Sequence, residues 1–501
     1  MNPHRADDNS PFKEICGAGV VLKLLCALEE DEEFVMEQYS DLAAIGTIGD
    51  VMPLINENRY IVRRGLENIR SSQNLGVAQL LKSAGSEPEK VTSTSLAFTV
   101  CPRINSAGRI ANADKAVQLL LSDTPEKARL LSEELNLLNT QRRAEENKIM
   151  EGVEAQIKQR PELLKERVLV LSGEGWHHGV IGIIAARLLE KYGKPVLMIS
   201  SENGEARGSA RGIDGFSIYK LLDRCSIVLT KFGGHMKAGG FSLPAEKVED
   251  FRQMVYGFCR ECYPKMPEYT ACADMEMTGD RLTMEQITEL SKLEPCGEGN
   301  SVPLFLLKNC TVSAVNPLSQ GKYTRLELIS GGVRLSALCF GIPYAKFHAA
   351  AGSMVDIIAT AEINEFNGKR EVVLKVQELR PSDFREDRFF AAQRTYEEIS
   401  RGEGCDGRLA PRVVPDREAL KKVYDLLRQH GGKMSAEDLC VYGGSGLNYC
   451  MLRIALDTFA SSGMAEISAD AGDVRLIPVS QKTDLMASGF LADLRRSLSL
   501  T

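Results

Sequence analysis

The spacing of apolar residues divides the chain into stretches of different secondary structure. In residues 19–30 and 40–54 the apolar positions recur every three or four residues, which predicts amphipathic helices. Residues 124–159 continue this spacing over a longer run, whose middle section, NTQRRAEEN, is polar on every side. Because a helix with such a section often bridges two domains, we place a domain boundary near residue 160.

Residues 167–263 have the pattern of an α/β domain. Short apolar runs such as RVLVLSG and KPVLMIS are typical of buried strands, and they alternate with helical patterns such as GVIGIIAARLLEKYG. Strands that alternate with helices usually form a mostly parallel sheet with helices on its faces. We therefore expect such a sheet here, with EARGSARGI as an extended segment and FGGHMKAGGF as a Gly-rich loop.

The pattern changes to β-rich beyond residue 270. Five short strand-like runs, separated by the turns SQGK, SGG and FNGK and by one helical insert near 343–351, predict an OB-fold barrel over 270–380. Residues 381–411 are polar, charged and Gly-rich, which favours a linker. In 412–501, three helical patterns precede a β-ribbon, an order that resembles a winged helix.

Composition narrows the class of protein. A chain of 501 residues is too long for one core, and a net charge of −7 argues against a protein that coats nucleic acid, although a local basic cleft remains compatible with it. The apolar runs are too short for a membrane span, and the polar N-terminus is not a signal peptide. Thirteen scattered cysteines then indicate reduced thiols and a cytoplasmic location. The CxxC pair, Cys259 and Cys262, has no second pair, so incidental thiols are favoured over a zinc or redox site.

The extended segment EARGSARGI carries the first candidate site. Arg207, Ser209 and Arg211 are spaced two residues apart, so they share one face of a strand. Guanidinium groups match phosphate oxygens in geometry and charge. A phosphate-binding strand and an ordinary solvated face are both compatible with this pattern.

The loop FGGHMKAGGF is the second candidate. Gly233 and Gly234 permit positive φ and a close backbone approach, so successive N–H groups can form an anion-binding nest. His235 and Lys237 add side-chain donors. His235 has no acidic or histidine neighbour in the sequence, which favours phosphate binding over metal binding, with a tight surface turn as the structural alternative.

A third candidate is CPRINSAGRI, residues 101–110, which we expect to form a polar loop. Arg103, Asn105, Ser106 and Arg109 surround Gly108 there, and such a loop could clamp a phosphate or a sugar. A plain surface loop is the more common case.

Asp50 follows a glycine at the end of an apolar run and could bind a divalent cation, although an Asp there is more often a turn or cap residue. The only Trp, Trp176, is more consistent with packing than with base stacking. The histidines show no spacing suited to a metal pair; they are His4, His177, His178, His235, His348 and His430.

Several stretches together resemble the RecJ family, the bacterial single-stranded-DNA-specific 5′→3′ exonucleases of the DHH/DHHA1 phosphoesterases. In chain order these stretches are GAGVVLKLLCAL, DLAAIGTIGDVMPLINENR, RINSAGRI, GEGWHHGVIGIIAARL, GSARGIDGFSI, FGGHMKAGGFSL and LEPCGEGNSVPLF. The resemblance implies an α/β protein that contains part of a DHH domain, a DHHA1 domain and an OB-fold barrel, before the winged-helix-like region. The implied divisions are 1–123 for the C-terminal part of the DHH domain, 124–160 for a connecting helix, 167–263 for DHHA1, 270–380 for the OB-fold, 381–411 for the linker and 412–501 for the winged-helix-like domain.

The resemblance also implies roles for individual residues. Asp50 matches the last metal-binding Asp of the DHH motifs, and His235 lies in the DHHA1 signature near the scissile phosphate, so these two are the expected catalytic residues. The residues expected to hold phosphate are Arg103, Asn105, Arg109, Ser209, Arg211, Gly233, Gly234 and Lys237. A Mn²⁺ or Mg²⁺ pair would activate the attacking water.

The earlier metal-binding motifs of the family, Asp-x-Asp and Asp-His-His, are missing from this sequence. Asp50 alone cannot hold a metal pair, so the metal site is incomplete. We expect a RecJ-type exonuclease of DNA repair or recombination whose chain is incomplete here. The alternatives are a non-catalytic relative that binds single-stranded DNA and a DHHA1 phosphodiesterase of short oligonucleotides. Single-stranded DNA is the expected partner, with a repair helicase or a single-strand-binding protein as a further one, and no membrane is involved.

Overall fold

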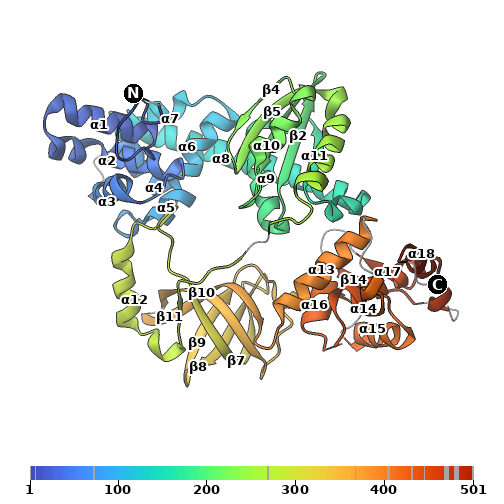
Figure 1. The fold of residues 1–501 in the computed structure, drawn as a ribbon. Helices are drawn as coiled ribbons and strands as arrows, with labels where there is room; N and C mark the ends of the chain where they lie inside the picture. The colour runs from blue at the N-terminus through green and yellow to red at the C-terminus, as the bar shows by residue number, and fades with distance from the viewer. Residues whose placement is uncertain are drawn as a thin grey trace. The chain divides into compact units, whose positions relative to one another are not determined.

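The chain folds into two compact units (Figure 1). The computed structural model describes residues 2–5, 7–71, 74–267, 270–366, 368–402, 407–429, 433–444, 446–467, 473–478 and 484–498. The helical unit consists of Met1–Lys148, His177–Val180 and Met284–Pro303. The β-rich unit consists of Ile149–Trp176, Ile181–Thr283 and Leu304–Thr501.

The helical unit confirms the helices predicted near its start. Its elements are α1 (Gly17–Glu29), α2 (Glu32–Gly49), α3 (Asn56–Ser71), α4 (Leu75–Ser83), α5 (Ser93–Phe98), α6 (Val100–Ile110), α7 (Asp114–Leu120), the first part of α8 (Pro125–Gln159) and α12 (Met284–Leu290). The long helix predicted over 124–159 is also confirmed, as α8. Leu80, Leu96, Leu119 and Leu135 are fully buried and belong to one core cluster, so helices from α4 to α8 share a core.

Helices α2 and α3 pack unusually closely. A Cβ atom on Gly65 of α3 would lie 2.3 Å from the carbonyl oxygen of Ser40 on α2, and 2.4 Å from the Cβ atom of Ala44. Only glycine allows this approach, since any side chain would push the two helices apart.

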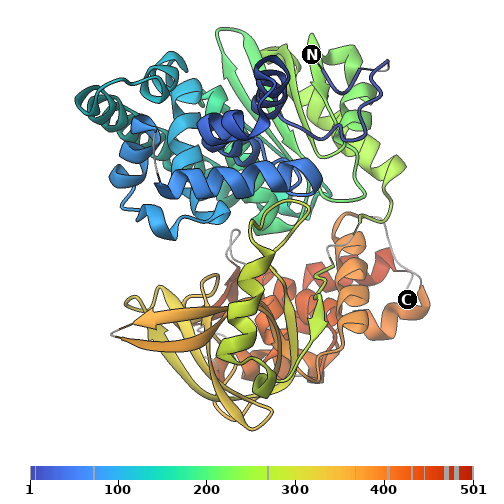
Figure 2. The same cartoon turned by 90° about the vertical axis from the view of Figure 1, so that its left-hand side faces the viewer.

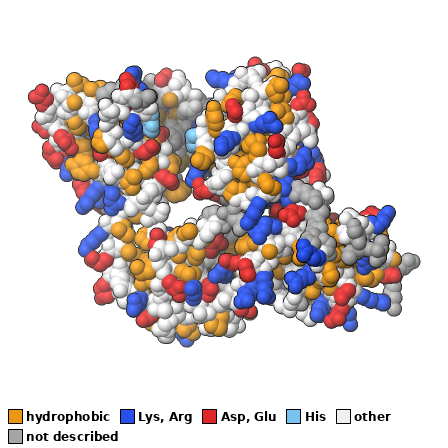
Figure 3. Space-filling view, in the orientation of Figure 1, with side chains coloured by type: hydrophobic (Ala, Val, Ile, Leu, Met, Phe, Trp, Pro, Cys, Tyr) orange, Lys and Arg blue, Asp and Glu red, His pale blue; other side chains and the backbone are white. Residues whose placement is uncertain are grey.

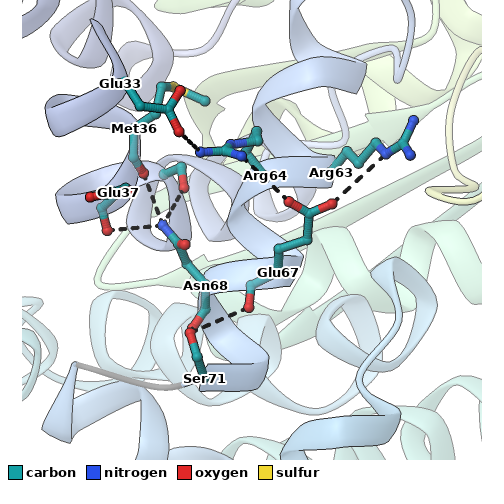
Figure 4. A network of polar contacts seen from close by, with 9 residues as sticks. Glu33, Met36, Glu37, Arg63, Arg64, Glu67, Asn68 and Ser71 are labelled. Carbon is teal, nitrogen blue, oxygen red and sulfur yellow. Dashed lines mark hydrogen bonds and ion pairs between the residues drawn. The ribbon is translucent and has the colours of Figure 1, made fainter. Parts of the chain in front are cut away.

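Polar contacts hold the same two helices in register (Figure 4). Asn68 on α3 donates to the carbonyl oxygen of Met36 at 2.9 Å and to the hydroxyl of Ser40 at 2.8 Å. Arg64, one turn earlier on α3, is paired with Glu33 on α2. Helix α2 ends at Gly49, and Asp50 directly follows it. The packing of α3 against α2 therefore fixes the position of Asp50.

The first sheet of the β-rich unit corrects one prediction. Its strands are β1 (Leu169–Glu174), β2 (Val196–Glu202), β3 (Glu205–Arg211), β4 (Lys231–Gly234) and β5 (Ala238–Pro244). They lie in the order β1-β2-β3-β5-β4, and only the β1–β2 pair is parallel. The predicted mostly parallel sheet is therefore wrong. A crossover helix, α9 (His178–Tyr192), connects β1 to β2, but β2 turns straight back into β3 through left-handed Asn203 and Gly204.

Helices pack on both faces of this sheet. Ala206 and Ala210 of β3 share a core cluster with Phe251 of α11 (Val248–Cys262), while Ser209 lies next to α9 on the other face. The α10 helix (Ile218–Arg224) completes this region. Alternate residues of β3 therefore face different helices, as the spacing of Arg207, Ser209 and Arg211 predicted.

A closed barrel follows (Figures 1 and 2). Its strands are β6 (Met275–Glu276), β7 (Phe305–Leu318), β8 (Tyr323–Ser330), β9 (Val333–Cys339), β10 (Met354–Phe366) and β11 (Lys369–Pro381). Pairing of β10 with β7 closes the barrel, and β9 runs parallel to β11. The five long strands confirm the predicted OB-fold, whereas the helical insert near 343–351 is reduced to one 3₁₀ turn, Tyr344–Lys346.

The C-terminal region has the predicted winged-helix-like order. Its elements are α13 (Glu386–Ser400), α14 (Ala410–Val413), α15 (Arg417–Gln429), β12 (Lys433–Ser435), α16 (Ala436–Val441), α17 (Tyr449–Ser461), β13 (Ala465–Ile467), β14 (Asp473–Leu476) and α18 (Gly489–Ser497). The strands form a small sheet in the order β12-β14-β13. Residues 403–406 of the predicted linker and 468–472 of the predicted ribbon lie outside the described residues.

Helix α13 occupies most of the segment predicted to be a linker, so that prediction is wrong for residues 386–400. Phe389 packs its ring 5.0 Å from that of Tyr449, and the Tyr396 hydroxyl donates to Asp457 at 2.7 Å. The polar composition of the segment concealed the helical spacing of these aromatic residues.

The packing of α13 also covers α17, the third helix of the winged-helix-like region. In a helix-turn-helix protein that reads duplex DNA, the recognition helix must be free to enter the major groove. Here the residues of α17 that are buried are Tyr449, Cys450, Leu452, Ile454, Ala455, Leu456, Thr458 and Phe459. We therefore assign α17 a structural role in this region.

The close contact at Gly65 gives the first testable prediction. Gly65→Ala should lower the free energy of unfolding by about 1–3 kcal/mol, because the added methyl group collides with the backbone of α2. The measurement is the midpoint of thermal unfolding, followed by circular dichroism.

Gly257→Ala is the matched control for Gly65→Ala. Gly257 lies inside α11, and a Cβ atom there would meet nothing within 4 Å. This variant should be more stable than the parent by about 0.5–1 kcal/mol, the usual gain from replacing glycine within a helix. Equal midpoints for the Gly65→Ala variant and the parent would contradict the close α2–α3 contact.

Candidate functional site

Ser209 and Arg211 form a pair of donors on the face of β3 that packs against α9. The guanidinium Nη1 of Arg211 donates to the Ser209 hydroxyl at 3.2 Å and to the carbonyl oxygen of Ala210 at 2.8 Å. A Cβ atom on Gly182 of α9 would lie 3.0 Å from Ser209 Oγ and 3.2 Å from Arg211 Nη2. The two side chains are therefore held between a strand and a helix, a fixed arrangement that suits a tetrahedral anion.

Sequence reasoning did not identify Gly182, although a signal for it exists. A glycine inside an otherwise regular helical pattern lowers helix stability, so its presence indicates a close packing contact. The pattern GVIGIIAARL contains such a glycine, but only the structure shows that it faces Ser209 and Arg211.

The first turn of α9 contacts Arg109 within the helical unit. Arg109 Nη1 donates to the carbonyl oxygen of Gly179 at 3.1 Å, and a Cβ atom on Gly179 would lie 2.6 Å from the Arg109 carbonyl oxygen. His177 Nδ1 accepts the N–H of Gly179 at 3.1 Å, so the His177 side chain caps the start of the helix. A helix N-terminus with an exposed arginine beside it provides positive potential for an anion.

The segment that holds Arg109 is not the predicted polar loop. Residues Val100–Ile110 form α6, which buries Cys101, Ser106 and Ala107. Pro102 is tolerated because it lies in the first turn of the helix. Burial of the apolar side of α6 outweighed the proline and glycine that suggested a loop.

Arg103 and Asn105 lie on different sides of α6. Arg103 donates to the side-chain oxygen of Asn136 at 2.6 Å and to the carbonyl oxygen of Thr99 at 2.6 Å. Burial, together with nearby Arg143, lowers the pKa of Arg103. Asn105 is exposed and is spaced four residues from Arg109, so these two share a side of the helix.

The stretch FGGHMKAGGF is a β-hairpin, in which β4 and β5 are paired and residues 235–237 make the turn. The His235 N–H donates to the carbonyl oxygen of Ala238 at 2.8 Å. The N–H of His235 is therefore used inside the turn, and the anion-binding nest stays a prediction for the N–H groups of Gly233 and Gly234. Gly234 has φ of 151°, and a Cβ atom there would lie 2.4 Å from the Ala238 carbonyl oxygen, whereas Gly233 has open space around it.

Two side chains at the tip of this hairpin are exposed. His235 projects from the turn as an exposed residue, and Lys237 Nζ lies 2.7 Å from Asp214 Oδ1. The carbonyl oxygen of Lys237 accepts the N–H of Gly212, one residue beyond β3. The hairpin tip is thus tied to the end of the strand that carries Ser209 and Arg211.

The positive charge of this region is largely balanced locally. Further ion pairs join basic residues of this domain to carboxylates: Arg207 to Glu205, Arg224 to Glu261 and Lys247 to Asp250. On the face drawn in Figure 3, basic and acidic side chains are interspersed. The β3 face therefore differs from the rest of the domain surface by the fixed hydrogen-bond donors Ser209 and Arg211, and not by a broad excess of positive charge.

Asp50 is the C-cap of α2, and its N–H donates to the carbonyl oxygens of Gly46 and Ile48. Its side chain is exposed. Within the described ranges, no group of three or more His, Cys, Asp and Glu side chains could hold a metal ion, and His430 lies outside those ranges. The described residues therefore do not fit a two-metal site by themselves, and we derive no chemical step through one.

Trp176 packs inside the β-rich unit. Cβ atoms on Gly173 and Gly152 would lie 2.2 Å and 3.4 Å from its indole ring. The packing interpretation of this residue is confirmed.

The fold combines an α/β domain, which carries the β3 site, with an OB-fold barrel. The DHHA1 domain family matches residues 165–261, and the RecJ OB domain family matches residues 273–378. The chain is 31% identical to the single-stranded-DNA-specific exonuclease RecJ of Haemophilus influenzae over 412 residues, which are 76% of this chain and 70% of that protein. It is also 31% identical to RecJ of Bacillus subtilis over 389 residues, which are 77% of this chain. The chain belongs to the RecJ family.

Solved structures of RecJ proteins agree with this family assignment. The crystal structure of RecJ from Thermus thermophilus in complex with Mn²⁺ matches with a TM-score of 0.65 and 29% identity, covering 75% of this chain and 55% of that one. A second, in complex with Mg²⁺, matches with a TM-score of 0.63 and 29% identity, covering 79% of this chain and 62% of that one. The chain spans about half the length of the Bacillus subtilis relative, 49%.

Cys101 gives a prediction about the packing beneath Asp50. Its Sγ would lie 3.7 Å from a Cβ atom on Gly49, and burial, with a smaller contribution from the Asp50 charge, raises its pKa to about 12. At pH 8 only about one thiol in ten thousand would then be the reactive thiolate. In native protein treated with a thiol reagent at pH 8, Cys101 should stay unmodified, as measured by mass spectrometry of its peptide.

The exposed Cys262 serves as the internal control, since it should react in the same sample. After unfolding in denaturant, both cysteines should react. Modification of Cys101 at the rate of Cys262 in the native protein would show that α2 and α6 do not enclose this thiol.

Proposed function

We propose that this chain binds the 5′ end of single-stranded DNA and takes part in its 5′→3′ hydrolysis as a RecJ-type exonuclease, in DNA repair or recombination. The observation that carries the proposal is the Ser209–Arg211 pair, fixed between β3 and α9. A hydroxyl and a guanidinium in one rigid place suit a terminal phosphate, which carries more charge than an internal phosphodiester. The OB domain and the exonuclease names of the relatives support single-stranded DNA as the ligand.

We also propose roles in phosphate binding for three residues of α6. Arg109, exposed beside the first turn of α9, would contribute a second guanidinium to phosphate, and Asn105 on the same side of α6 would assist it. Arg103 is committed to Asn136 and Thr99, so we assign it the positioning of α6 rather than direct phosphate contact.

The hairpin tip would lie along the strand near the scissile phosphate. The open space at Gly233 would allow a close approach of the DNA backbone, Gly234 would shape the turn beside it, and Lys237 would add a positive charge. His235, exposed at the turn, is the candidate to hold or transfer a proton at that phosphate.

Asp50 would supply one carboxylate to a Mn²⁺ or Mg²⁺ pair. The two solved relatives were crystallised in complex with these ions. The described residues do not form such a site alone.

A second candidate function is binding without hydrolysis, as in a non-catalytic relative. The lack of a metal-binding cluster among the described residues favours it. The two candidates differ in one assay, the release of nucleotides from single-stranded DNA in Mn²⁺ by the purified chain. We propose a cytoplasmic location for either, and none of the described helices has the length and apolarity needed to cross a bilayer.

Arg211→Ala tests the phosphate role directly. The variant should bind a 5′-phosphorylated single strand at least about 10-fold more weakly than the parent, since a hydrogen bond to a charged group contributes about 1.5–3 kcal/mol. Its affinity for the same strand with a 5′-hydroxyl should change much less. Fluorescence anisotropy with a label at the 3′ end measures both affinities without requiring catalysis.

Arg224→Ala is the matched control, because Arg224 is an exposed arginine paired with Glu261 on the same domain. It removes the same charge and should leave the preference for 5′-phosphate intact. Gly182→Ala should reduce that preference, because its methyl group would displace Ser209 and Arg211. Equal losses for both strand types in Arg211→Ala would reject the 5′-phosphate role.

A further inference from the structure

Gly179, in the first turn of α9, is held through both of its polar backbone groups. Its N–H donates to His177 Nδ1 at 3.1 Å, and its carbonyl oxygen accepts Arg109 Nη1 at 3.1 Å. The Arg109 backbone also lies so close that a Cβ atom on Gly179 would be 2.6 Å from the Arg109 carbonyl oxygen. One glycine therefore connects the imidazole of His177 with the guanidinium of Arg109.

The backbone that carries His177 is itself fixed. His177 directly follows Trp176, whose indole is packed and whose carbonyl oxygen accepts the hydroxyl of Ser200 on β2. The carbonyl oxygen of His177 accepts the N–H of Val180 at 2.9 Å. The imidazole therefore starts from a well-held position when it reaches the N–H of Gly179.

The hydrogen bond from Gly179 to His177 supplies a partner that the helix cannot. The first N–H groups of a helix have no carbonyl oxygen four residues earlier to donate to, and the N–H of Gly179 is one of them. Glycine also has more backbone freedom than any other residue, so an uncapped first turn would fray easily here. His177 occupies the N-cap position and prevents this, which gives the Gly179 carbonyl oxygen a fixed direction.

That fixed direction matters for Arg109, which is exposed at the end of α6. An exposed arginine samples many rotamers, and a ligand that binds it must offset the loss of this freedom. The bond from Nη1 to Gly179 restricts the side chain beforehand, which lowers the cost of binding. A guanidinium has five N–H donors, so one bond to Gly179 leaves others for a phosphate.

We propose that His177 is a positioning residue for phosphate recognition. By capping α9 it fixes the Gly179 carbonyl oxygen, and this carbonyl orients the Arg109 guanidinium for the 5′ phosphate of a single strand. His177 acts through Arg109, and its ring need not contact the DNA. This inference rests on the proposed function, in which Arg109 contributes a second guanidinium to that phosphate.

Two substitutions at His177 separate its acceptor from its ring. His177→Asn keeps an acceptor at the N-cap, a role that Asn74 and Asn448 already have at α4 and α17, but it removes the ring. His177→Phe keeps an aromatic ring and has no acceptor. Fluorescence anisotropy measures the affinity of each variant for a 5′-phosphorylated single strand and for the same strand with a 5′-hydroxyl.

The two variants should differ on the phosphorylated strand only. His177→Phe should bind it about fivefold or more weakly than the parent, whereas His177→Asn should stay within about twofold of the parent. On the 5′-hydroxyl strand, both variants should stay within about twofold of the parent, which also shows that they are folded.

A double-mutant cycle with Arg109 tests the route of the effect. In an Arg109→Gln background, His177→Phe should cause less than about a twofold further loss, because the side chain that it positions is already gone. A residue that acts only on general stability would cause the same loss in both backgrounds. His348→Phe is the matched control, since His348 lies beside Asp438 in another part of the chain; it should leave the preference for 5′-phosphate unchanged.

The outcomes distinguish this inference from the proposed function. If the parent prefers the phosphorylated strand and His177→Phe keeps that preference, the positioning role is rejected while the proposed function stands. Equal losses for His177→Asn and His177→Phe would also overturn it, because the ring and not the acceptor would then matter, and so would equal losses with and without Arg109. If the parent does not distinguish the two strands, the 5′-phosphate proposal fails and the positioning role with it.

Discussion

The close approach of α9 to β3 is the constraint on which the candidate site depends. Gly182 allows it, because a Cβ atom there would lie 3.0 Å from Ser209 Oγ. Elsewhere on α9, Ile184 and Leu188 are fully buried. The hydroxyl of Ser209 and the guanidinium of Arg211 are consequently fixed before any ligand arrives, which is how a protein recognises a phosphate with few charges. This suits a chain whose net charge is −7.

Glycine serves the same purpose elsewhere in the molecule. Gly65 brings α3 against α2, whose end carries Asp50, and Gly179 brings the first turn of α9 against Arg109. Gly234 permits the tight β4–β5 hairpin that presents His235. In each case a backbone contact, rather than a side chain, sets the position of a candidate functional residue. Substitutions at these glycines should therefore change function through geometry, without altering any reactive group.

The sequence predicted the elements better than their arrangement. Periodicity located α8, the five long barrel strands and the order of the C-terminal elements, because each has a regular apolar face. Periodicity could not give the direction of the strands, because strand pairing depends on residues outside each strand. The antiparallel pairing of β2 with β3 follows from the tight turn at Asn203 and Gly204, which the apolar pattern of the two strands does not reveal. The α13 helix was missed because two aromatic residues, Phe389 and Tyr396, carry its packing within a polar segment.

The candidate site was predicted in part. Alternation along a strand was enough to place Ser209 and Arg211 on one face, because that periodicity is a property of the backbone. The contact between Arg109 and Gly179 joins residues that lie far apart in the sequence, so local patterns could not predict it. Of the N–H groups around the expected anion-binding nest, that of His235 donates to the Ala238 carbonyl oxygen inside the turn, a non-local pairing that the glycine pattern did not reveal.

The proposed function combines a phosphate site on the β3 face with an OB-fold barrel that would bind the strand. Single-stranded DNA is the proposed ligand, and the described residues supply candidate phosphate-binding groups more completely than metal ligands. Binding at a 5′ end is therefore the central claim for this chain, and hydrolysis follows only where further metal ligands are present.

A crystal structure of the chain with a 5′-phosphorylated single-stranded oligonucleotide tests that claim most directly. The account predicts the terminal phosphate within hydrogen-bonding distance of the Ser209 hydroxyl and the Arg211 guanidinium. A strand bound with its 5′ phosphate away from β3, or with its 3′ end at these two residues, would contradict it.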